Sequence, residues 1–374
     1  MDEDLTEEQQ MLLDASTRFI EEACPLTAVR DGAYADPGFA AAYRRQAGEL
    51  GWFSFVVPEE QGGGSVSGNG AVDAALVAYR RGRLLQPGPF TGTNVVAAAL
   101  AEAGSDEHRG QVVPALIAGE ASASWAYGAA PGLPARVGAI SAVSTAGGWR
   151  LAGRAIFVED PGPDGWLLVT ATTEDGLAQF LLPVGEAAVE VVPLESLDLS
   201  RRFVEVRFDG GSVPATALVG RPGAIDDLVA RQVALAATLT VAETVGAMAH
   251  EFEMTVQYAK DRIAFGRPIG SFQAIKHVLA DTSLNLEMGK ALALAAARPA
   301  GEGDPYAGQA ASIAKAFVGD TGIDLAQNCF QVFGGIGYTW EHDQHLYLRR
   351  ISTDATFHGD PSWHREHLCQ LAGL

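Results

Sequence analysis

The longest unbroken pattern in the chain is a helical one that runs from about Ile225 to Asp261. It is longer than an average globular helix, and helical periodicity continues from it to the end of the chain. The first third is helical as well, from Glu7 to Trp52 and again up to Ala118. Between the two helical parts, short apolar runs alternate with Gly, Pro and Asp, which is typical of strands and turns.

This helical, β, helical order predicts an α+β multidomain protein with units at residues 1–120, 121–221 and 222–374. Turn signals recur about every ten residues in the middle unit, which favours an antiparallel barrel or sandwich. Breaks are expected at Pro37-Gly38 and in the turn Val57–Gly64, and Pro299–Asp304 is expected to be a loop between long helices.

The charge balance excludes several classes of function. The chain has 26 Lys and Arg against 46 Asp and Glu, a formal net charge of -20, which disfavours nucleic acids and anionic membranes. Any nucleotide site must therefore depend on locally placed arginines and helix N-termini. Cys24, Cys329 and Cys369 lack metal-type spacing. The acidic N-terminus and the broken apolar runs predict a soluble, cytoplasmic protein without a membrane span or a metal site.

The most informative segment runs from Tyr258 to His277. We expect a helix to end at Gly266, a turn at Pro268 and Gly270, and a new helix capped by the Ser271 hydroxyl. Such a corner would display Arg262, Phe265 and free backbone N–H groups, which suit a pyrophosphate and a flat ring. An ordinary helix corner with a salt-bridged arginine would explain this segment taken alone.

A second segment, Phe330–Tyr338, has glycines where a backbone turns sharply or comes close to another group, and the polar Gln331 at its edge. The pair of segments resembles the paired FAD-binding signatures of acyl-CoA dehydrogenases. The helix, β, helix order, the Pro-Glu-Glu-x-Gly-Gly-like turn at Val57–Gly64 and Arg349 extend the resemblance over the whole chain.

The resemblance implies an acyl-CoA dehydrogenase-like fold: an N-terminal helical domain, a middle β-barrel and a C-terminal four-helix bundle that dimerises. It also implies FAD as the cofactor, an acyl-CoA thioester as the substrate and an electron-transferring flavoprotein as the electron acceptor. In the family, the two segments reach FAD in the neighbouring subunit. The cofactor contacts implied for this chain are Arg262, Phe265, Phe272, Gln273, Gln331, Gly334 and Gly335.

The family's reaction needs a carboxylate base, and this chain departs from the pattern there. The family removes the α-proton of the acyl group while the β-hydrogen passes as hydride to the flavin. The usual position of the glutamate, counted from Gly335, falls on His358. The alternative position, on the long helix, falls on Ala236. Neither residue is a carboxylate.

The part of the family's site that holds a chain's own flavin ring also differs. The family's Thr-Glu-Pro-x-x-Gly-Ser-Asp loop reads Trp125–Gly132 here, without the Thr, Ser or acidic groups. The strand that carries aromatic-Ile-Thr-Asn reads Ile156–Glu159. The hypothesis is a non-catalytic subunit of a heteromeric dehydrogenase, resembling the heteromeric enzymes of actinobacterial steroid and side-chain degradation, with a related partner that supplies the base in a heterotetramer.

Alternatives remain at this stage. The chain could be a self-sufficient homo-oligomer with a relocated base, either Glu243, seven residues after Ala236, or His358. It could also be a scaffold that binds no ligand. Asp354 and Asp360 are further carboxylates near the same turn. His358, Asp360, His364 and His367 have the residue types of a metal site, although packed or solvated histidines are commoner.

Overall fold

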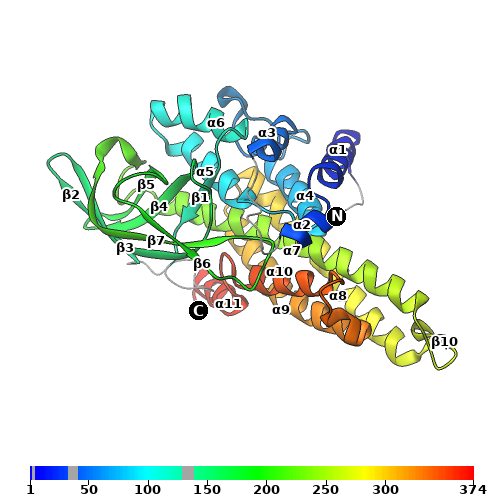
Figure 1. The fold of residues 1–374 in the computed structure, drawn as a ribbon. Coiled ribbons are helices and arrows are strands. Elements are labelled where there is room, and N and C mark those ends of the chain that lie inside the picture. The colour runs from blue at the N-terminus through cyan, green and yellow to red at the C-terminus, as the bar shows by residue number, and fades with distance from the viewer. Residues whose placement is uncertain (2–4, 33–40, 129–138) are drawn as a thin grey trace.

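The computed structural model describes residues 1, 5–32, 41–128 and 139–374, and Figure 1 shows three regions that follow one another along the chain. The predicted Pro37-Gly38 break lies outside the described residues. The helical prediction for the first third is confirmed. A π-helical turn, His108–Val112, leads into the last of these helices. The helices are α1 (Glu7–Ala23), α2 (Leu26–Gly32), α3 (Ala41–Glu49), α4 (Gly70–Arg83), α5 (Phe90–Ala103) and α6 (Val113–Ile117).

The middle region is one eight-stranded sheet in the order β6-β7-β3-β2-β4-β5-β8, with β1 paired to β4. Its strands are β1 (Ala123–Ala126), β2 (Ile140–Thr145), β3 (Gly148–Glu159), β4 (Trp166–Thr173), β5 (Gly176–Pro183), β6 (Glu190–Leu194), β7 (Phe203–Pro214) and β8 (Leu218–Val219).

The prediction of an antiparallel barrel needs two corrections. Strands β1 and β2 run parallel to β4, so the sheet is mixed. The end strands β6 and β8 do not pair with each other within the described residues, so the sheet stays open. Turn signals in a sequence predict hairpins between neighbours, but they carry no information on which distant strands pair.

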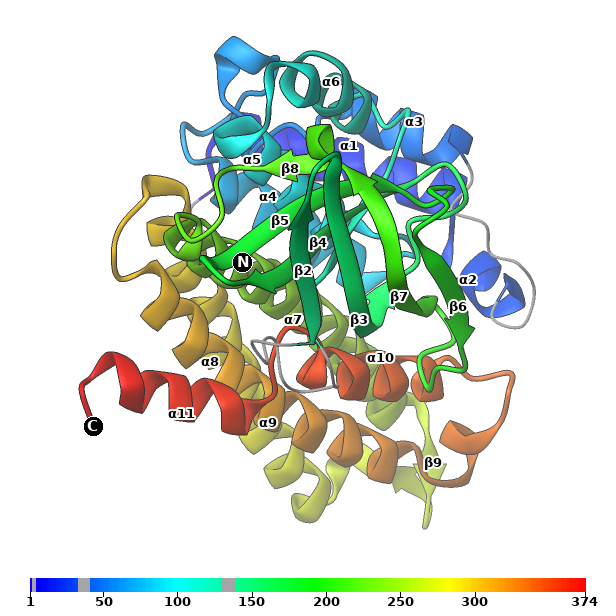
Figure 2. The same cartoon turned by 90° about the vertical axis from the view of Figure 1, so that its left-hand side faces the viewer.

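The C-terminal region is a four-helix bundle of α7 (Asp226–Asp261), α8 (Gln273–Glu302), α9 (Ala307–Phe333) and α10 (Gln344–Thr356), with α11 (Pro361–Leu371) against α9. In Figure 2 the sheet faces the viewer, with the N-terminal helices above it and this bundle below, and behind it α4 packs directly against α7. By length and composition α7 could cross a membrane, but 83% of its apolar window is buried inside the protein. It is the central helix of the fold, because its side chains enter two of the apolar cores.

The small residues of α7 have two different roles. A Cβ atom on Gly246 would lie 2.0 Å from the Tyr79 carbonyl oxygen, and one on Gly82 would lie 1.9 Å from that of Glu243. The second half of α7 therefore uses glycine to let α4 approach closely. Ala234 and Ala237, in the first half, line a cleft instead.

Two local predictions in this region are wrong. Helix α8 passes through Pro299 and ends at Gly303, whose φ is +66°. Proline in a last turn removes one backbone donor, and the left-handed glycine sets the helix end. Ser271 does not cap α8, since the helix begins at Gln273 and the Ser271 hydroxyl is buried without a hydrogen-bond partner.

Candidate functional site

The corner that carries Arg262 is a tight hairpin rather than a helix that ends at Gly266. Helix α7 ends at Asp261, and β9 (Ile263–Ala264) pairs antiparallel with β10 (Arg267–Pro268). The two turn residues, Phe265 and Gly266, have φ of +51° and +78°. Positive φ at both positions matches the twist of a two-residue hairpin, but it is unusual for an aromatic residue. The turn holds the Phe265 ring 95% exposed.

The diglycine segment has bare backbone for two different reasons. Gly334 has φ +62° and ψ -138°, a conformation that side chains disfavour. Gly335 has no positive φ, and a Cβ built on it would meet no atom within 4 Å. Nothing in the described chain requires glycine at position 335. Close approach of a group from outside the chain would explain it.

The two segments meet, as the cofactor prediction requires. The ring of Tyr258, one turn before Arg262, lies 4.9 Å from the ring of Phe333, which directly precedes Gly334. Both segments lie at the end of the bundle that points away from the sheet (Figure 1). Of the seven predicted contacts, Phe272 and Gly334 are half-buried and the others are exposed: Arg262, Phe265, Gln273, Gln331 and Gly335.

The surface around these residues is also unusually apolar. Ile263 is 58% exposed and Tyr338 is 79% exposed, and Ile336 lies between the glycines and Tyr338. Clustered exposed apolar side chains at one end of a soluble protein are typical of an interaction surface. The exposed residues therefore form an interaction surface at this end of the bundle.

The two positions where the family carries its base converge in space. The Thr240 hydroxyl donates to the Ala236 carbonyl at 2.8 Å, and its oxygen lies 2.9 Å from Nδ1 of His358. Burial, helped by the charges of Lys315 and Arg201, lowers the pKa of His358 to about 3. No pattern in the sequence predicted the contact of Thr240 with His358.

A buried lysine fixes the turn that carries His358. The Lys315 Nζ donates to the carbonyls of Ala355 at 3.0 Å and Gly359 at 2.7 Å, which bracket that turn. His358 itself has φ +57°. Burial lowers the pKa of Lys315 to about 7, although Asp354 and Asp360 raise it. The two hydrogen bonds from Lys315 thus stabilise the strained turn.

The tail histidines are occupied by protein contacts. His364 is fully buried, with Nδ1 3.0 Å from the Ser312 hydroxyl and Nε2 3.1 Å from the His358 carbonyl. The His367 ring stacks on Trp363. Within the described residues no three His, Cys, Asp or Glu side chains are grouped to hold a metal ion. Asp360 caps α11 by accepting from the Trp363 N–H.

Glu243 sits between two arginines. Its Oε2 lies 2.7 Å from Nη2 of Arg201, and its Oε1 accepts from Nη1 of Arg350 at 2.9 Å. Burial alone would raise the pKa of Glu243, but the two guanidinium groups outweigh it and lower the pKa. A carboxylate with both oxygens occupied by cations is a poor proton acceptor. These contacts argue against Glu243 as a relocated base.

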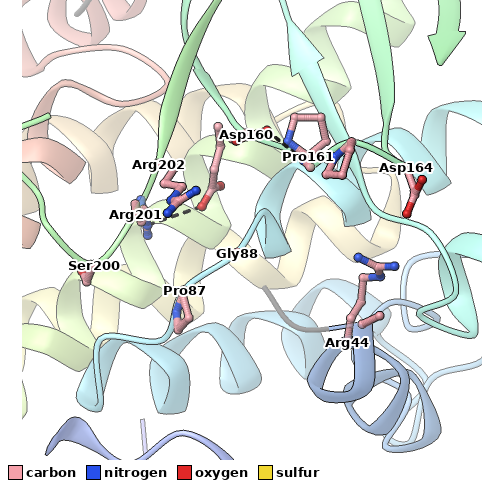
Figure 3. Close-up of a pocket in the computed structure, with 13 residues that line it drawn as sticks. Arg44, Pro87, Gly88, Asp160, Pro161, Asp164, Ser200, Arg201 and Arg202 are labelled. Atoms are coloured by element: carbon pink, nitrogen blue, oxygen red, sulfur yellow. Dashed lines mark hydrogen bonds and ion pairs between the residues drawn. The ribbon is translucent and has the colours of Figure 1, made fainter. Parts of the chain in front are cut away.

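The same charged cluster reaches a small cavity between the first region and the sheet. The cavity, of about 300 Å³, is lined by Arg44, the Pro87-Gly88 turn, the end of β3 and residues 200–202 (Figure 3). Glu159 lies on its wall, 3.7 Å from Arg201, with Oε1 lacking a hydrogen-bond partner. Burial, which outweighs the attraction to Arg201, raises its pKa to about 7. At the family's amide position this chain thus has a buried carboxyl group tied to Arg201.

The strand that faces the flavin ring in the family ends in an aromatic cluster here. A β-bulge lies between Ala155 and Val158, and Phe157 has φ +62°. The Phe157 ring stacks on Phe203 at 4.3 Å and meets Phe357, next to His358, at 5.4 Å. These rings offer no hydrogen-bond donors for a flavin edge. The described residues at this position therefore lack the side-chain donors that the family places against the flavin ring. The loop residues 129–132 lie outside the described residues.

A larger cleft, of about 610 Å³, lies beside the turn of His358 and is lined by Ala234, Ala237 and His364. Its charged lining is mainly acidic: Asp226, Asp227 and Asp304 against Arg231. The Arg231 guanidinium is in turn paired with Glu102. Carboxylates at this density disfavour phosphate groups.

Two histidines, the buried His364 and the half-buried His358, predict a loss of stability in acid. The pKa of His364, like that of His358, is lowered to about 3 from an ordinary value of 6.5, chiefly by burial. Below pH 6.5 the unfolded chain binds protons that the folded chain does not, so the free energy of unfolding falls as the pH drops from 6.5 towards 3. His364→Gln, whose amide keeps a donor for the His358 carbonyl, should flatten this dependence in urea unfolding between pH 6.5 and 4. His277→Gln, at an exposed position, should show the same dependence of unfolding free energy on pH as the native chain. An equal dependence in the native chain, His277→Gln and His364→Gln would contradict the role given to His364.

Comparisons with known proteins agree with this geometry. The profile "Acyl-CoA dehydrogenase, C-terminal domain" matches residues 227–370, and "Acyl-CoA dehydrogenase, N-terminal domain" matches residues 6–120. Acyl-CoA dehydrogenase IpdE2 of Mycobacterium tuberculosis is 30% identical over 353 residues, covering 93% of this chain and 92% of IpdE2. Acyl-CoA dehydrogenase FadE34 of the same organism is 34% identical over 338 residues, covering 88% of this chain and 42% of FadE34, so the chain spans less than half of that relative.

The fold has close counterparts among solved structures. The ChsE4-ChsE5 complex from Mycobacterium tuberculosis superposes with a TM-score of 0.89 at 26% identity, covering 100% of this chain and 99% of that one. Butyryl-CoA dehydrogenase from Megasphaera elsdenii has the same fold, with a TM-score of 0.88 at 21% identity, covering 100% of both chains. The chain belongs to the acyl-CoA dehydrogenase family of FAD-dependent oxidoreductases that act on CH–CH bonds.

Proposed function

We propose that this chain is the subunit of a heteromeric acyl-CoA dehydrogenase that lacks the usual catalytic glutamate. One contrast carries the proposal: the exposed half of the site keeps residue types that suit a dinucleotide, while the inner half lacks the family's hydrogen-bond donors and its glutamate. The inner half holds the aromatic cluster of Phe157, Phe203 and Phe357, and His358 stands at the position of the base. Such a chain supports an FAD seated mainly in a partner, and the partner supplies the base.

Each exposed residue has a role that its chemistry suits. Arg262 and Gln331 can hydrogen-bond phosphate oxygens, and Phe265 and Phe272, whose rings meet edge to face at 6.2 Å, can flank the adenine. Gly334 and Gly335 let the backbone approach the pyrophosphate, and Gln273 borders the same surface. FAD, once bound, supplies the hydride acceptor for desaturation of the acyl group.

The acidic cleft supports the proposal that the partner, not this chain, binds the acyl-CoA. CoA carries several phosphate charges, which the carboxylates of Asp226, Asp227 and Asp304 in this cleft would repel. A partner with a more basic cleft would bind the acyl-CoA thioester. The named relatives suggest what that partner resembles, since the ChsE4-ChsE5 structure is a complex of two different chains. Electrons would then leave through an electron-transferring flavoprotein, and the acyl group would come from fatty acid or steroid breakdown.

Co-expression with the products of the neighbouring genes tests the proposal. We expect a stable complex, a heterotetramer by the family resemblance, with fewer FAD molecules than subunits. Flavin absorbance against protein mass gives the ratio, and desaturation assays on acyl-CoA thioesters give the activity. The chain purified alone should hold no FAD and desaturate nothing. One FAD per subunit together with activity in the chain alone would establish a self-sufficient homo-oligomer, and no FAD in any combination would leave the scaffold alternative.

A further inference from the structure

The side chain of His358 is held in one tautomer by a contact outside the known machinery of the site. The Thr240 hydroxyl has a single proton, and its oxygen lies 2.8 Å from the Ala236 carbonyl oxygen. Two oxygens at that distance attract each other only if the hydroxyl proton lies between them. Thr244 and Thr255 make the same contact with the carbonyls one turn before them.

The hydroxyl proton is therefore committed to the helix backbone. Nδ1 of His358 lies 2.9 Å from the same hydroxyl oxygen, so Nδ1 must be the donor and carry the ring proton. In a neutral imidazole the other nitrogen, Nε2, is then an acceptor with a lone pair. Nε2 has no partner among the described residues, His358 is half-buried, and its backbone carbonyl contacts His364, which lines the cleft.

We propose that Thr240 is a positioning residue that fixes His358 as the Nδ1–H tautomer, so that Nε2 presents a hydrogen-bond acceptor and no donor to a ligand. The tautomer of His358 does not depend on the proposed function. Only its consequence for substrate binding rests on that function. An acceptor at this point bonds a hydroxyl or an amide N–H of a ligand. It cannot donate to a thioester carbonyl or to a phosphate oxygen, which are acceptors themselves.

The surroundings keep the ring neutral and so keep the acceptor available. Lys315 lies beneath the turn, and both it and Arg201 oppose a positive charge on His358. The same cations weaken the ring as a base for a carbon-bound proton, since a good general base has a pKa near the working pH. In place of the family's proton-accepting glutamate, His358 is thus a neutral group that binds only ligands with a hydrogen-bond donor at this point.

The tautomer can be read directly from the ¹⁵N and ¹H shifts of histidine-labelled full chain, with His358→Gln to assign the signal. We expect a protonated Nδ1 and an unprotonated Nε2 in the native protein. Thr240→Val, which keeps the shape and removes the hydroxyl, should abolish this pattern and give a mixture of tautomers. Thr238→Val is the matched control. Thr238 lies on the same helix, and its buried hydroxyl has no hydrogen-bond partner.

A protonated Nε2 in the native chain would overturn the proposal, and so would an unchanged signal in Thr240→Val. If that variant does not fold, the native spectrum alone decides the tautomer. The measurement needs neither FAD nor a partner. If the tautomer is confirmed but the chain never joins a flavin complex, only the proposed function is refuted. If the chain joins a flavin complex but the tautomer is wrong, only the role of Thr240 is refuted.

Discussion

Arg350→Met is expected to lower the free energy of unfolding by about 3–5 kcal/mol, the usual cost of removing one partner from a buried charge cluster. Arg350 is fully buried and lies 2.7 Å from Asp198 and 2.9 Å from Glu243. Methionine fills much of the volume but leaves both carboxylates short of a cation. Unpaired buried charge is far costlier than the loss of packing.

The effect should reach all three regions of the fold. Besides its two acids, Arg350 donates to the carbonyls of Leu85 and Gln86, after α4, and to the Ser200 hydroxyl in the middle region. One side chain of α10 thus joins the N-terminal helices, the sheet region and α7. We expect the unfolding transition of the variant to broaden or divide as these regions lose their common link.

Arg349→Met provides the control, because the neighbouring Arg349 is partly exposed and donates to the Leu197 carbonyl. Urea unfolding followed by circular dichroism should show a small change for this variant, since surface contacts contribute little. Equal losses for the two variants would show that the buried cluster does not hold the regions together.

The sequence predicts best those features that depend on near neighbours. Helical periodicity marked the helices of the first and last regions, and the two segments expected to meet around a cofactor lie together in the fold. The hairpin at Phe265-Gly266 was mistaken for a helix end, because glycine after a helix usually terminates it. Two positive φ values in succession are a property of the folded turn that composition alone does not reveal.

Features built from distant residues could not be predicted. Arg201 and Arg350 meet around Glu243, although about 150 residues separate the two arginines along the chain. The same holds for Thr240 and His358, and for the parallel pairing of β1 with β4. The family resemblance predicts that the base is missing at Ala236 and His358, and the fold shows that these two positions are neighbours and what surrounds them.

Arg262→Gln in the complex with the partner is expected to weaken FAD binding by about tenfold to a hundredfold, because a charge-assisted bond to phosphate contributes about 1.5–3 kcal/mol. Arg267→Gln, on the opposite strand of the hairpin, is the matched control. Its guanidinium lies 4.0 Å from the centre of the Phe272 ring, so it is engaged within the chain. If loss of general positive charge were the cause, both variants would lose FAD equally.

Gly335→Ala separates binding from folding at the same surface. The position has no positive φ, and an added Cβ meets nothing within 4 Å, so the chain alone should keep its unfolding midpoint. In the complex, the new methyl group would occupy the space that the pyrophosphate needs, and FAD should dissociate faster in a flavin fluorescence assay. Unchanged FAD retention in both Gly335→Ala and Arg262→Gln would show that this end of the bundle contacts no dinucleotide, and the proposed role of the chain as the supporting half of a shared site would fail.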